Sequence, residues 1–380
     1  MKKKVCFVAT LELSVKVFLT DHMRLLQEDY DLSVIVNTEN THFLDSFDVR
    51  ATVIPVQIER KISPLNDLKC LIELHRIFRR EKFDILHSIM PKSGFLSMVA
   101  GLFARIPVRV HTFTGQFWKN DSGVKRFIFK NVDKLLAMCA TNVLVDSPSQ
   151  RDFLIGEGVI GRKKSSVIGK GSMCGVDVER FHFDEEARRR IRETYGIAPD
   201  ETVFLFLGRM NRDKGVLDLA RAFASLCGKF EGTRLLLAGP DEDDVVQEVL
   251  QICDQCLDRV HIQGFTDVPE KLMSAADVFC LPSYREGFGL VIAEAAAVGI
   301  PSIGSRIYGI TDTIDDEVTG FFSEPSAHYD LMLKMSRFVE DKSLIRSMGD
   351  KARARTLEKY SKDKVVAAMR EYYKRLERSL

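Results

Sequence analysis

The chain has 380 residues, of which 45% are hydrophobic and 29% charged, with a formal net charge of +1. This length favours two domains of roughly 100 to 200 residues each, and the apolar runs are far shorter than the roughly 20 residues that cross a bilayer. Residues 1–180 hold 27 Lys and Arg against 20 Asp and Glu, so the first half is basic and the second acidic. A basic half favours an anionic partner, either a membrane surface or a diphosphate group. Nucleic acid is not expected, because aromatic residues do not interleave with the basic ones.

The first half alternates short apolar runs with helix-like stretches, which is the pattern of a parallel sheet covered on both faces. Residues 4–10 are predicted to form a buried strand rather than a signal peptide, because the apolar stretch breaks at Glu12 and no small-residue cleavage site follows. Further strands are predicted at 32–38, 51–56, 84–90, 109–115, 142–148 and 165–171, and helices at 67–82, 93–105 and 122–140.

A glycine-rich stretch without periodicity, residues 169–184, is predicted to be a linker. The alternation then resumes, with strands predicted at 202–210, 233–240, 259–265, 277–283 and 301–306. The last segment is predicted to be an amphipathic helix, one side of which carries Val365, Val366, Met369, Tyr372, Tyr373 and Leu376. The pattern therefore predicts an α/β protein with two doubly wound, Rossmann-like domains, residues 1–172 and 173–360, facing across a cleft.

No metal site is expected from the cysteines or the acidic residues. Eight cysteines include one C-x-x-C pair, Cys253 and Cys256, but neither a second pair nor histidines stand at ligand spacing. We therefore expect free thiols in a reducing cytoplasm and no disulfides. The acidic run at 241–244 follows a predicted strand and opens a helix, where carboxylates favour the helix dipole.

The segment FLFLGRMNRDKG, residues 204–215, is a candidate anion site. A strand ends at Gly208, and Arg209 and Lys214 precede the start of a helix. Two cations beside the free amides of a helix N-terminus suit a diphosphate. Alternatively, these two cations pair with Asp213 and Asp218 on the surface.

The segment SYREGFGLVIAEAAAVG, residues 283–299, predicts a second loop and helix at the same edge of the sheet. Glu294 would lie about one turn into the helix, where a carboxylate can accept the hydroxyls of a ribose. Glu286 would lie in the loop before the helix and meet whatever lies beyond the diphosphate. The alternative is a surface salt bridge for either glutamate. The amides that would face the ligand belong to Phe288, Gly289 and Leu290.

GRMNRDKG followed by EGFGLVIAE resembles the donor-site signature of the retaining GT-B glycosyltransferases of family 4, the E-x7-E group that includes many bacterial capsule and O-antigen transferases. The similarity runs the length of the chain, including the linker segment GVDVERF and the segment VTGFF at 318–322, which is expected to form a hairpin. The resemblance implies that the terminal helix, residues 361–380, crosses back onto the first domain. It also implies a nucleotide-diphosphate-sugar donor, retention at the anomeric carbon and no required metal or other cofactor.

Carried over by resemblance, Arg209 and Lys214 would hold the diphosphate and stabilise the leaving group in place of a divalent ion. Glu294 would bind the ribose and Glu286 the hydroxyls of the donor sugar. The phosphate cradle would be completed by the backbone amides of Phe288, Gly289 and Leu290.

The acceptor is expected on the first domain. Lys92 begins a predicted helix and forms another candidate anion site, while His87 is either a satisfied strand-end histidine or an acceptor contact. Thr114 and Gly115 occupy the position where many family members place a histidine and a glycine close to the reacting sugar. His111 comes three residues earlier, so its catalytic role is left open.

Two departures from the family pattern bear on the acceptor side. The first loop, residues 9–22, has no glycine where relatives have two, so contacts there would have to come from the side chains of Ser14 or Lys16. Cys174 stands in the linker where relatives often have an asparagine. Neither change removes the donor site.

We therefore expect a cytoplasmic glycosyltransferase, at the inner face of the membrane, that moves a hexose or N-acetylhexosamine from a UDP-sugar to a lipid-diphosphate-linked or saccharide acceptor. A peripheral contact with anionic lipid is expected from the basic first domain. The alternatives are a sugar-nucleotide 2-epimerase of the same architecture and a non-catalytic protein that binds a nucleotide sugar. A nicotinamide-dependent dehydrogenase is disfavoured, because no G-x-G-x-x-G follows the first strand.

Overall fold

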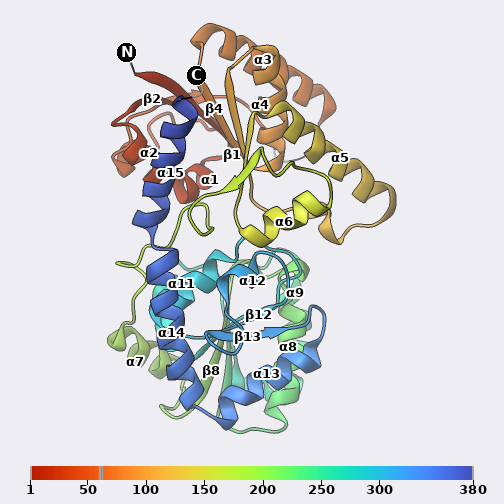
Figure 1. Ribbon diagram of the computed structural model, residues 1–380. Helices are drawn as coiled ribbons and strands as arrows, with labels where there is room; N and C mark the ends of the chain where they lie inside the picture. Colours follow the sequence, from red (N-terminus) through yellow and green to blue (C-terminus); the bar gives the residue numbers. More distant parts are fainter. Residues whose placement is uncertain (1, 60, 62, 379–380) are drawn as a thin grey trace. The chain divides into compact units, whose positions relative to one another are not determined.

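The computed structural model describes residues 2–59, 61 and 63–378. The chain divides into two compact units (Figure 1): unit 1 comprises Met1–Gly175 and Lys362–Leu380, and unit 2 comprises Val176–Ser361. The predicted boundary between residues 172 and 173 thus lies three residues before the observed one, and the second crossing falls after Ser361 rather than after residue 360. Each unit is a doubly wound parallel sheet with helices on both faces, which confirms the predicted fold class.

Unit 1 is built on a seven-stranded parallel sheet in the order β3-β2-β1-β4-β5-β6-β7. The strand order reverses direction between β1 and β4, which is where ligands of such sheets bind, outside the carboxyl ends of the strands. The strands are β1 (Lys3–Leu11), β2 (Tyr30–Asn37), β3 (Thr52–Pro55), β4 (Ile85–Ile89), β5 (Val108–Phe113), β6 (Asn142–Val145) and β7 (Ser165–Val167).

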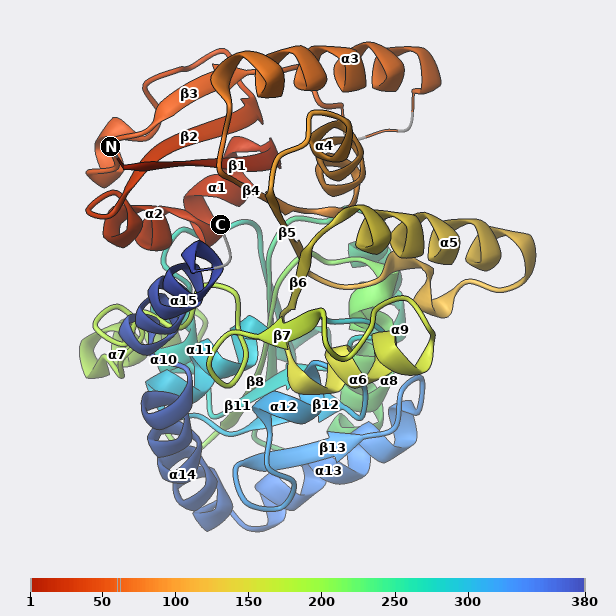
Figure 2. The same ribbon diagram turned by 45° about the horizontal axis from the view of Figure 1, so that its top comes forward.

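Strand alternation gives unit 1 two separate hydrophobic cores. Val5 and Phe7 of β1 belong to one core, and Cys6 and Val8 belong to the other, because successive side chains of a strand point to opposite faces. Figure 2 shows α3, α4 and α5 in a row along one side of the sheet, and α3 packs on α4 and α4 on α5. The helices are α1 (Glu12–Phe18), α2 (Thr20–Leu26), α3 (Pro64–Glu81), α4 (Pro91–Phe103), α5 (Gly123–Cys139), α6 (Pro148–Gly156) and α15 (Lys362–Glu377).

The terminal helix α15 is part of unit 1, where it packs on α2. All six residues predicted for its apolar side are buried, so the predicted amphipathic pattern is confirmed. The hydroxyl of Tyr373 shares a 2.7 Å hydrogen bond with Nδ1 of His87, and Arg370 bonds Asp29 at 2.7 Å. These polar contacts add directional constraints to a largely apolar interface and so help to fix the position of the helix within unit 1.

Unit 2 is built on a six-stranded parallel sheet in the order β10-β9-β8-β11-β12-β13, with its reversal between β8 and β11. The strands are β8 (Thr202–Leu207), β9 (Thr233–Ala238), β10 (Val260–Gln263), β11 (Val278–Leu281), β12 (Ser302–Ser305) and β13 (Gly320–Ser323). The helices are α7 (Glu185–Thr194), α8 (Val216–Cys227), α9 (Val245–Ile252), α10 (Pro269–Ala275), α11 (Leu290–Val298), α12 (Ile310–Thr313), α13 (His328–Glu340) and α14 (Ser343–Lys359).

The expected hairpin at 318–322 is wrong. Gly320–Ser323 is the sixth strand of the sheet and pairs in parallel with β12. A β-carbon on Gly320 would lie 2.0 Å from the carbonyl oxygen of Ser302, and Gly320 has φ +159°. Glycine at this position therefore permits a close approach between strands. In the sequence alone, the same glycine indicates a turn.

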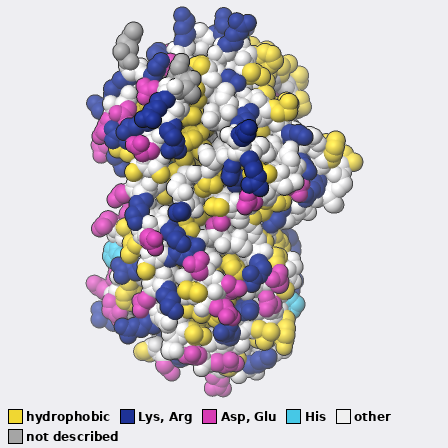
Figure 3. Space-filling model, viewed as in Figure 1, with side chains coloured by type: hydrophobic (Ala, Val, Ile, Leu, Met, Phe, Trp, Pro, Cys, Tyr) yellow, Lys and Arg dark blue, Asp and Glu magenta, His cyan; other side chains and the backbone are white. Residues whose placement is uncertain are grey.

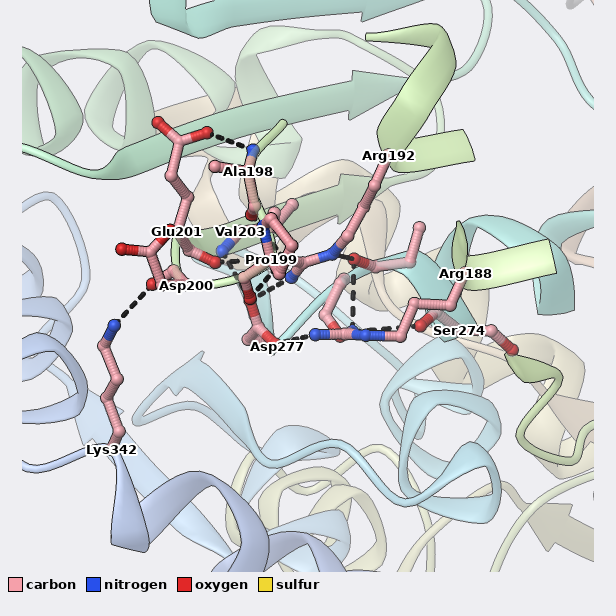
Figure 4. A network of polar contacts seen from close by, with 12 residues as sticks. Arg188, Arg192, Ala198, Pro199, Asp200, Glu201, Val203, Ser274, Asp277 and Lys342 are labelled. Carbon is pink, nitrogen blue, oxygen red and sulfur yellow. Dashed lines mark hydrogen bonds and ion pairs between the residues drawn. The ribbon is translucent and has the colours of Figure 1, made fainter. Parts of the chain in front are cut away.

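A buried ion-pair network fastens α7 to the amino-terminal edge of the unit 2 sheet (Figure 4). Asp277 accepts from Arg192 at 2.6 Å, from Arg188 at 2.8 Å and from the amide of Val203 at 2.7 Å. Arg192 is only 5% exposed, and its remaining donors reach backbone carbonyl oxygens, including that of Ala275 at 3.0 Å. Burying charges in this way is tolerated because each of them has a partner of good geometry.

We expect Arg192→Leu to lower the free energy of unfolding of unit 2 by about 3 kcal/mol, because it leaves several buried acceptors unpaired. The matched control Arg189→Leu changes an exposed arginine of the same helix and should stay within about 0.5 kcal/mol of the wild type. Urea unfolding followed by circular dichroism measures both, while fluorescence of Trp118, the single tryptophan of the chain, follows unit 1. Equal stability of the two variants would contradict this account of the network.

Candidate functional site

The loops after β8 and β11 meet at the point where the strand order of unit 2 reverses. The first loop runs through residues 208–215 and the second through 282–289. Both predicted motifs therefore lie at the same sheet edge, which is the usual ligand position in this kind of fold. All the predicted donor-site residues belong to unit 2.

The first loop is shaped by a local hydrogen bond and by the conformation of a glycine. The side chain of Asn211 accepts from the amide of Lys214 at 3.1 Å, which caps a short 3-10 turn. Gly215 follows with φ +70°, and a β-carbon there would lie 2.0 Å from the carbonyl oxygen of Pro282. The start of α8 can therefore touch the end of β11 only because this residue has no side chain.

The second loop is bonded directly to the first. The amide of Tyr284 donates to the carbonyl oxygen of Asp213 at 2.8 Å, and the Tyr284 hydroxyl donates to Asp218 at 2.6 Å. Arg285 pairs with the carboxylate of Asp213 at 2.8 Å. These three contacts hold the two loops side by side and so position the residue that follows, Glu286.

Lys214 and Glu286 form the central ion pair of the site, with Nζ and Oε1 2.5 Å apart. Their side chains are 19% and 14% exposed, so both are largely shielded from water. Arg209 is more exposed and pairs with Glu242 at 2.9 Å, and Glu242 also accepts from Asn211 at 3.1 Å. The alternative in which Arg209 and Lys214 pair with Asp213 and Asp218 is wrong, because those carboxylates bind Arg285, Tyr284 and Arg221.

The helix α11 begins at the end of the second loop without a side-chain cap. Gly289 is its N-cap, with φ +70°, and Gly299 is its C-cap, with φ +98°. The first amides of a helix have no partner within it, so those around Leu290 remain available to an anion. Gly309 packs against this loop, since a β-carbon there would lie 2.8 Å from the carbonyl oxygens of Glu286 and Gly287.

Glu294 lies in the second turn of α11 and is half-buried. Desolvation raises the pKa of its carboxyl group to about 7, while the charge of Arg180 lowers this pKa and that of Glu270 raises it. A carboxyl group with this pKa changes charge near neutral pH. A hydroxyl donor placed against it would favour the ionised form.

A cavity of about 410 Å³ lies beside the first loop, at the carboxyl ends of β8, β9 and β10. Its volume is within the range of small-molecule sites. Sequence reasoning missed it, although the glycines that end β9 and β10 could have indicated a close backbone approach. The lining residues are Met210, Gly239, Pro240, Asp241, Asp244, Val246, Gln247, Ile262 and Gly264.

The acidic run at 241–244 is used in capping and pairing. Asp241 accepts from the amides of Val245 and Val246 at the start of α9, and Asp243 accepts from the amide of Arg212 at 3.0 Å. Within the described part of the chain, no group of three or more His, Cys, Asp or Glu side chains is arranged to hold a metal ion.

The candidate histidines of unit 1 are buried and fully enclosed. His87 bonds Tyr373 through Nδ1 and Thr112 through Nε2, at 2.7 and 2.8 Å. Both ring nitrogens are therefore satisfied within unit 1, and neither is left to bind an acceptor substrate. His111 bonds Ser88 at 2.8 Å, and its Nε2 is buried without a hydrogen-bond partner among the described residues. Burial lowers the pKa of both histidines to about 3, so they are neutral at physiological pH and cannot act as cationic acids there.

The other acceptor candidates are distributed over the strand ends of unit 1. Ser14 is buried in α1, and Lys16 pairs with Glu12 at 3.0 Å. Lys92, at the start of α4, pairs with Asp67 of α3 at 2.7 Å. Thr114 and Gly115 follow β5 and are both half-buried. Residues 9–22, predicted to include a loop without glycine, instead contain α1, which begins directly after β1.

Comparison with known proteins matches each unit to a glycosyltransferase family. Residues 17–171 match the family described as "Glycosyl transferase 4-like domain", and residues 187–355 match "Glycosyl transferases group 1". The capsular polysaccharide biosynthesis glycosyltransferase CapM of Staphylococcus aureus is 30% identical over 314 residues, which cover 82% of this chain and 81% of CapM. The UDP-Gal:alpha-D-GlcNAc-diphosphoundecaprenol alpha-1,3-galactosyltransferase of Escherichia coli is 28% identical, over 87% of this chain and 85% of that protein.

Among solved structures, HepE of Anabaena in complex with UDP superposes with a TM-score of 0.80 at 19% identity, covering 98% of this chain and 100% of HepE. At this identity the likeness concerns the fold. Together with the CapM relationship and the two family matches, it shows that this chain belongs to the GT-B glycosyltransferases of family 4 and is a glycosyltransferase.

Proposed function

We propose that this glycosyltransferase moves a hexose or N-acetylhexosamine, with retention, from a UDP-sugar to a lipid-diphosphate-linked or saccharide acceptor in the synthesis of a cell-surface polysaccharide. The observation that carries the proposal is the arrangement at one sheet edge of unit 2, where Lys214, Glu286 and the uncapped start of α11 come together. The name of the Escherichia coli relative includes a UDP-sugar donor and a diphosphoundecaprenol-linked acceptor, and HepE was crystallised with UDP. Both support this choice of substrates.

In this proposal Lys214 and Arg209 bind the diphosphate, helped by the amides of Phe288, Gly289 and Leu290. The ion pair of Lys214 with Glu286 and that of Arg209 with Glu242 keep both cations ordered, and the diphosphate exchanges with those carboxylates. Glu286 is then free to accept hydroxyls of the donor sugar. The cavity beside the first loop suits the base in size and place. Glu294 accepts the ribose hydroxyls, which its position in α11 and its raised pKa support.

The proposed reaction breaks the bond between the anomeric carbon and the diphosphate oxygen and forms a bond to an acceptor hydroxyl on the same face. The negative charge that develops on the leaving diphosphate is stabilised by Lys214, Arg209 and the α11 amides. The proton of the acceptor hydroxyl passes to an oxygen of the leaving phosphate, because His111 is enclosed and burial lowers its pKa to about 3, which makes it a weak base. Two cationic side chains take the role that a divalent ion has in other transferases, so no metal is required.

On the acceptor side, we place the diphosphate of a lipid-linked acceptor at the start of α4, next to Lys92. This helix begins at the reversal of the unit 1 sheet, after Met90, which has φ +73°. A strained residue before a helix start is common at ligand sites. Unit 1 would work against the inner face of the cytoplasmic membrane. Among the described residues, no helix is both long and apolar enough to cross a bilayer.

Calorimetric titration with UDP, GDP, ADP, dTDP and CDP in EDTA tests the donor site. We expect selective, metal-free binding of UDP and a loss of about tenfold to a hundredfold in affinity in Glu294→Ala, because the ribose hydroxyls lose a charged acceptor. The matched control Glu340→Ala removes an exposed carboxylate of α13 and should bind like the wild type. Binding of no nucleotide, or unchanged affinity in Glu294→Ala, would count against the proposal.

UDP affinity should depend on pH through Glu294. Its pKa of about 7 means that the carboxylate, the form favoured by hydroxyl donors, is lost as the pH falls below about 7. Affinity should therefore drop by up to about tenfold for each pH unit below that value. Glu294→Gln should remove this component and leave the pH dependence of the nucleotide phosphate. Identical pH profiles for the wild type and Glu294→Gln, measured by calorimetry, would refute the assignment.

Lys214→Ala should lower kcat/KM by about a hundredfold to a thousandfold, because stabilisation of the leaving diphosphate is lost. The assay measures UDP release from UDP-galactose, UDP-glucose and UDP-N-acetylglucosamine with a GlcNAc-diphospholipid acceptor, and Lys229→Ala is the control. NMR of the new glycosidic bond reports retention or inversion. A C2 epimer formed from the donor without acceptor would instead identify a 2-epimerase.

A further inference from the structure

The outward face of α5 is apolar, although it faces solvent within unit 1. Val124, Phe127 and Met138 are 74%, 69% and 68% exposed, and Ile128 and Leu135 are also exposed. At 3.6 residues per turn these five positions fall within about 100° of one another, so they form one stripe along the helix. We call these five residues the α5 stripe. Single exposed apolar side chains are ordinary, but five of them along one face, interrupted midway by the exposed Asn131, mark an interaction surface.

The inward face of α5 is already occupied by the core. Leu136, Ala137 and Cys139 are buried there, and so is Asp133. The Asp133 carboxylate accepts from the indole nitrogen of Trp118 at 2.6 Å, and burial raises its pKa to about 6. The helix therefore has apolar residues on both its core side and its solvent side. Packing within unit 1 explains only the first of these.

Positive charge surrounds the α5 stripe. Residues 119–138 contain five Lys and Arg against two Asp, and one of these, Asp133, is buried. Lys125 pairs with Asp121, and Arg126 and Lys130 both pair with Glu157 of α6, so the side chains that flank the stripe include more cations than carboxylates. Lys125 and Lys134 lie on either side of the stripe in helical projection.

Neighbouring helices also expose apolar side chains. Leu102 and Phe103 at the end of α4 are exposed, and Arg105 follows them. Leu65, Leu68 and Ile72 are exposed along α3, which packs on α4 as α4 packs on α5. Figure 3 shows hydrophobic side chains at the surface over this side of unit 1.

We propose that the α5 stripe, with the cations around it, docks unit 1 onto an anionic lipid surface. Apolar side chains would enter the boundary between headgroups and acyl chains, while Lys125 and Lys134 contact lipid phosphates. Flanking cations favour lipid over a second copy of the chain, because a twofold contact through this face would bring like charges together. This inference rests on the proposed function, since an enzyme that uses a lipid-linked acceptor must reach that acceptor at a membrane surface.

Co-sedimentation of the full chain with vesicles tests the surface. We expect binding to vesicles of phosphatidylcholine with phosphatidylglycerol, weaker binding to phosphatidylcholine alone, and a decrease with added salt. F127S/I128S should reduce vesicle affinity at least tenfold, and Lys125→Gln with Lys134→Gln should reduce binding to the anionic vesicles only. The matched control Y329S/L333S removes two exposed apolar side chains from α13 of unit 2 and should bind like the wild type.

UDP calorimetry on F127S/I128S separates this inference from the proposed function. Normal UDP affinity together with lost vesicle binding supports the α5 stripe as a docking surface. Wild-type vesicle binding by F127S/I128S would overturn it, as would the absence of vesicle binding by the wild-type chain. A wild-type dimer that F127S/I128S converts to monomer, with no vesicle binding by either, would also overturn it and assign the stripe to self-association.

Discussion

The close approach of Gly215 to the carbonyl oxygen of Pro282 is the constraint on which the site in unit 2 depends. It allows the start of α8 to meet the end of β11, so that Tyr284 and Arg285 can reach Asp213 and Asp218. Any other amino acid at position 215 would also have to adopt a positive φ, which residues with a β-carbon rarely do. The ion pair of Lys214 with Glu286 joins the two loops that this contact brings together.

The electrostatics of the site rest on pairing rather than on isolated charge. Lys214 and Arg209 each have a carboxylate partner, while Glu294 lies half-buried, where desolvation rather than an ion pair controls its pKa. Paired cations are ordered before a ligand arrives, and this reduces the reorganisation needed to stabilise a developing phosphate charge. In the proposed function, the anionic ligand exchanges with partners that already hold the cations in place.

Unit 1 has a different electrostatic character. Its histidines are neutral and enclosed, since burial lowers the pKa of His87 and His111, and its net positive charge lies on surface helices such as α5. Chemistry by an ionised histidine is therefore not part of the proposed mechanism. Attraction of an anionic acceptor or an anionic lipid surface is consistent with this distribution.

The amino-acid sequence by itself determined the two parallel sheets, most strand and helix positions, the amphipathic side of α15 and the two glycine-bounded motifs of unit 2. These features are encoded locally, in periodicity and in turn residues. Only the tertiary structure decided which carboxylates pair with Arg209 and Lys214, since Lys214 and Glu286 are 72 positions apart. It also decided the parallel pairing of β13, the cavity beside the first loop, the enclosure of His87 by Tyr373 and the raised pKa of Glu294. Each of these depends on contacts or desolvation contributed by distant segments, for which a local pattern carries no signal.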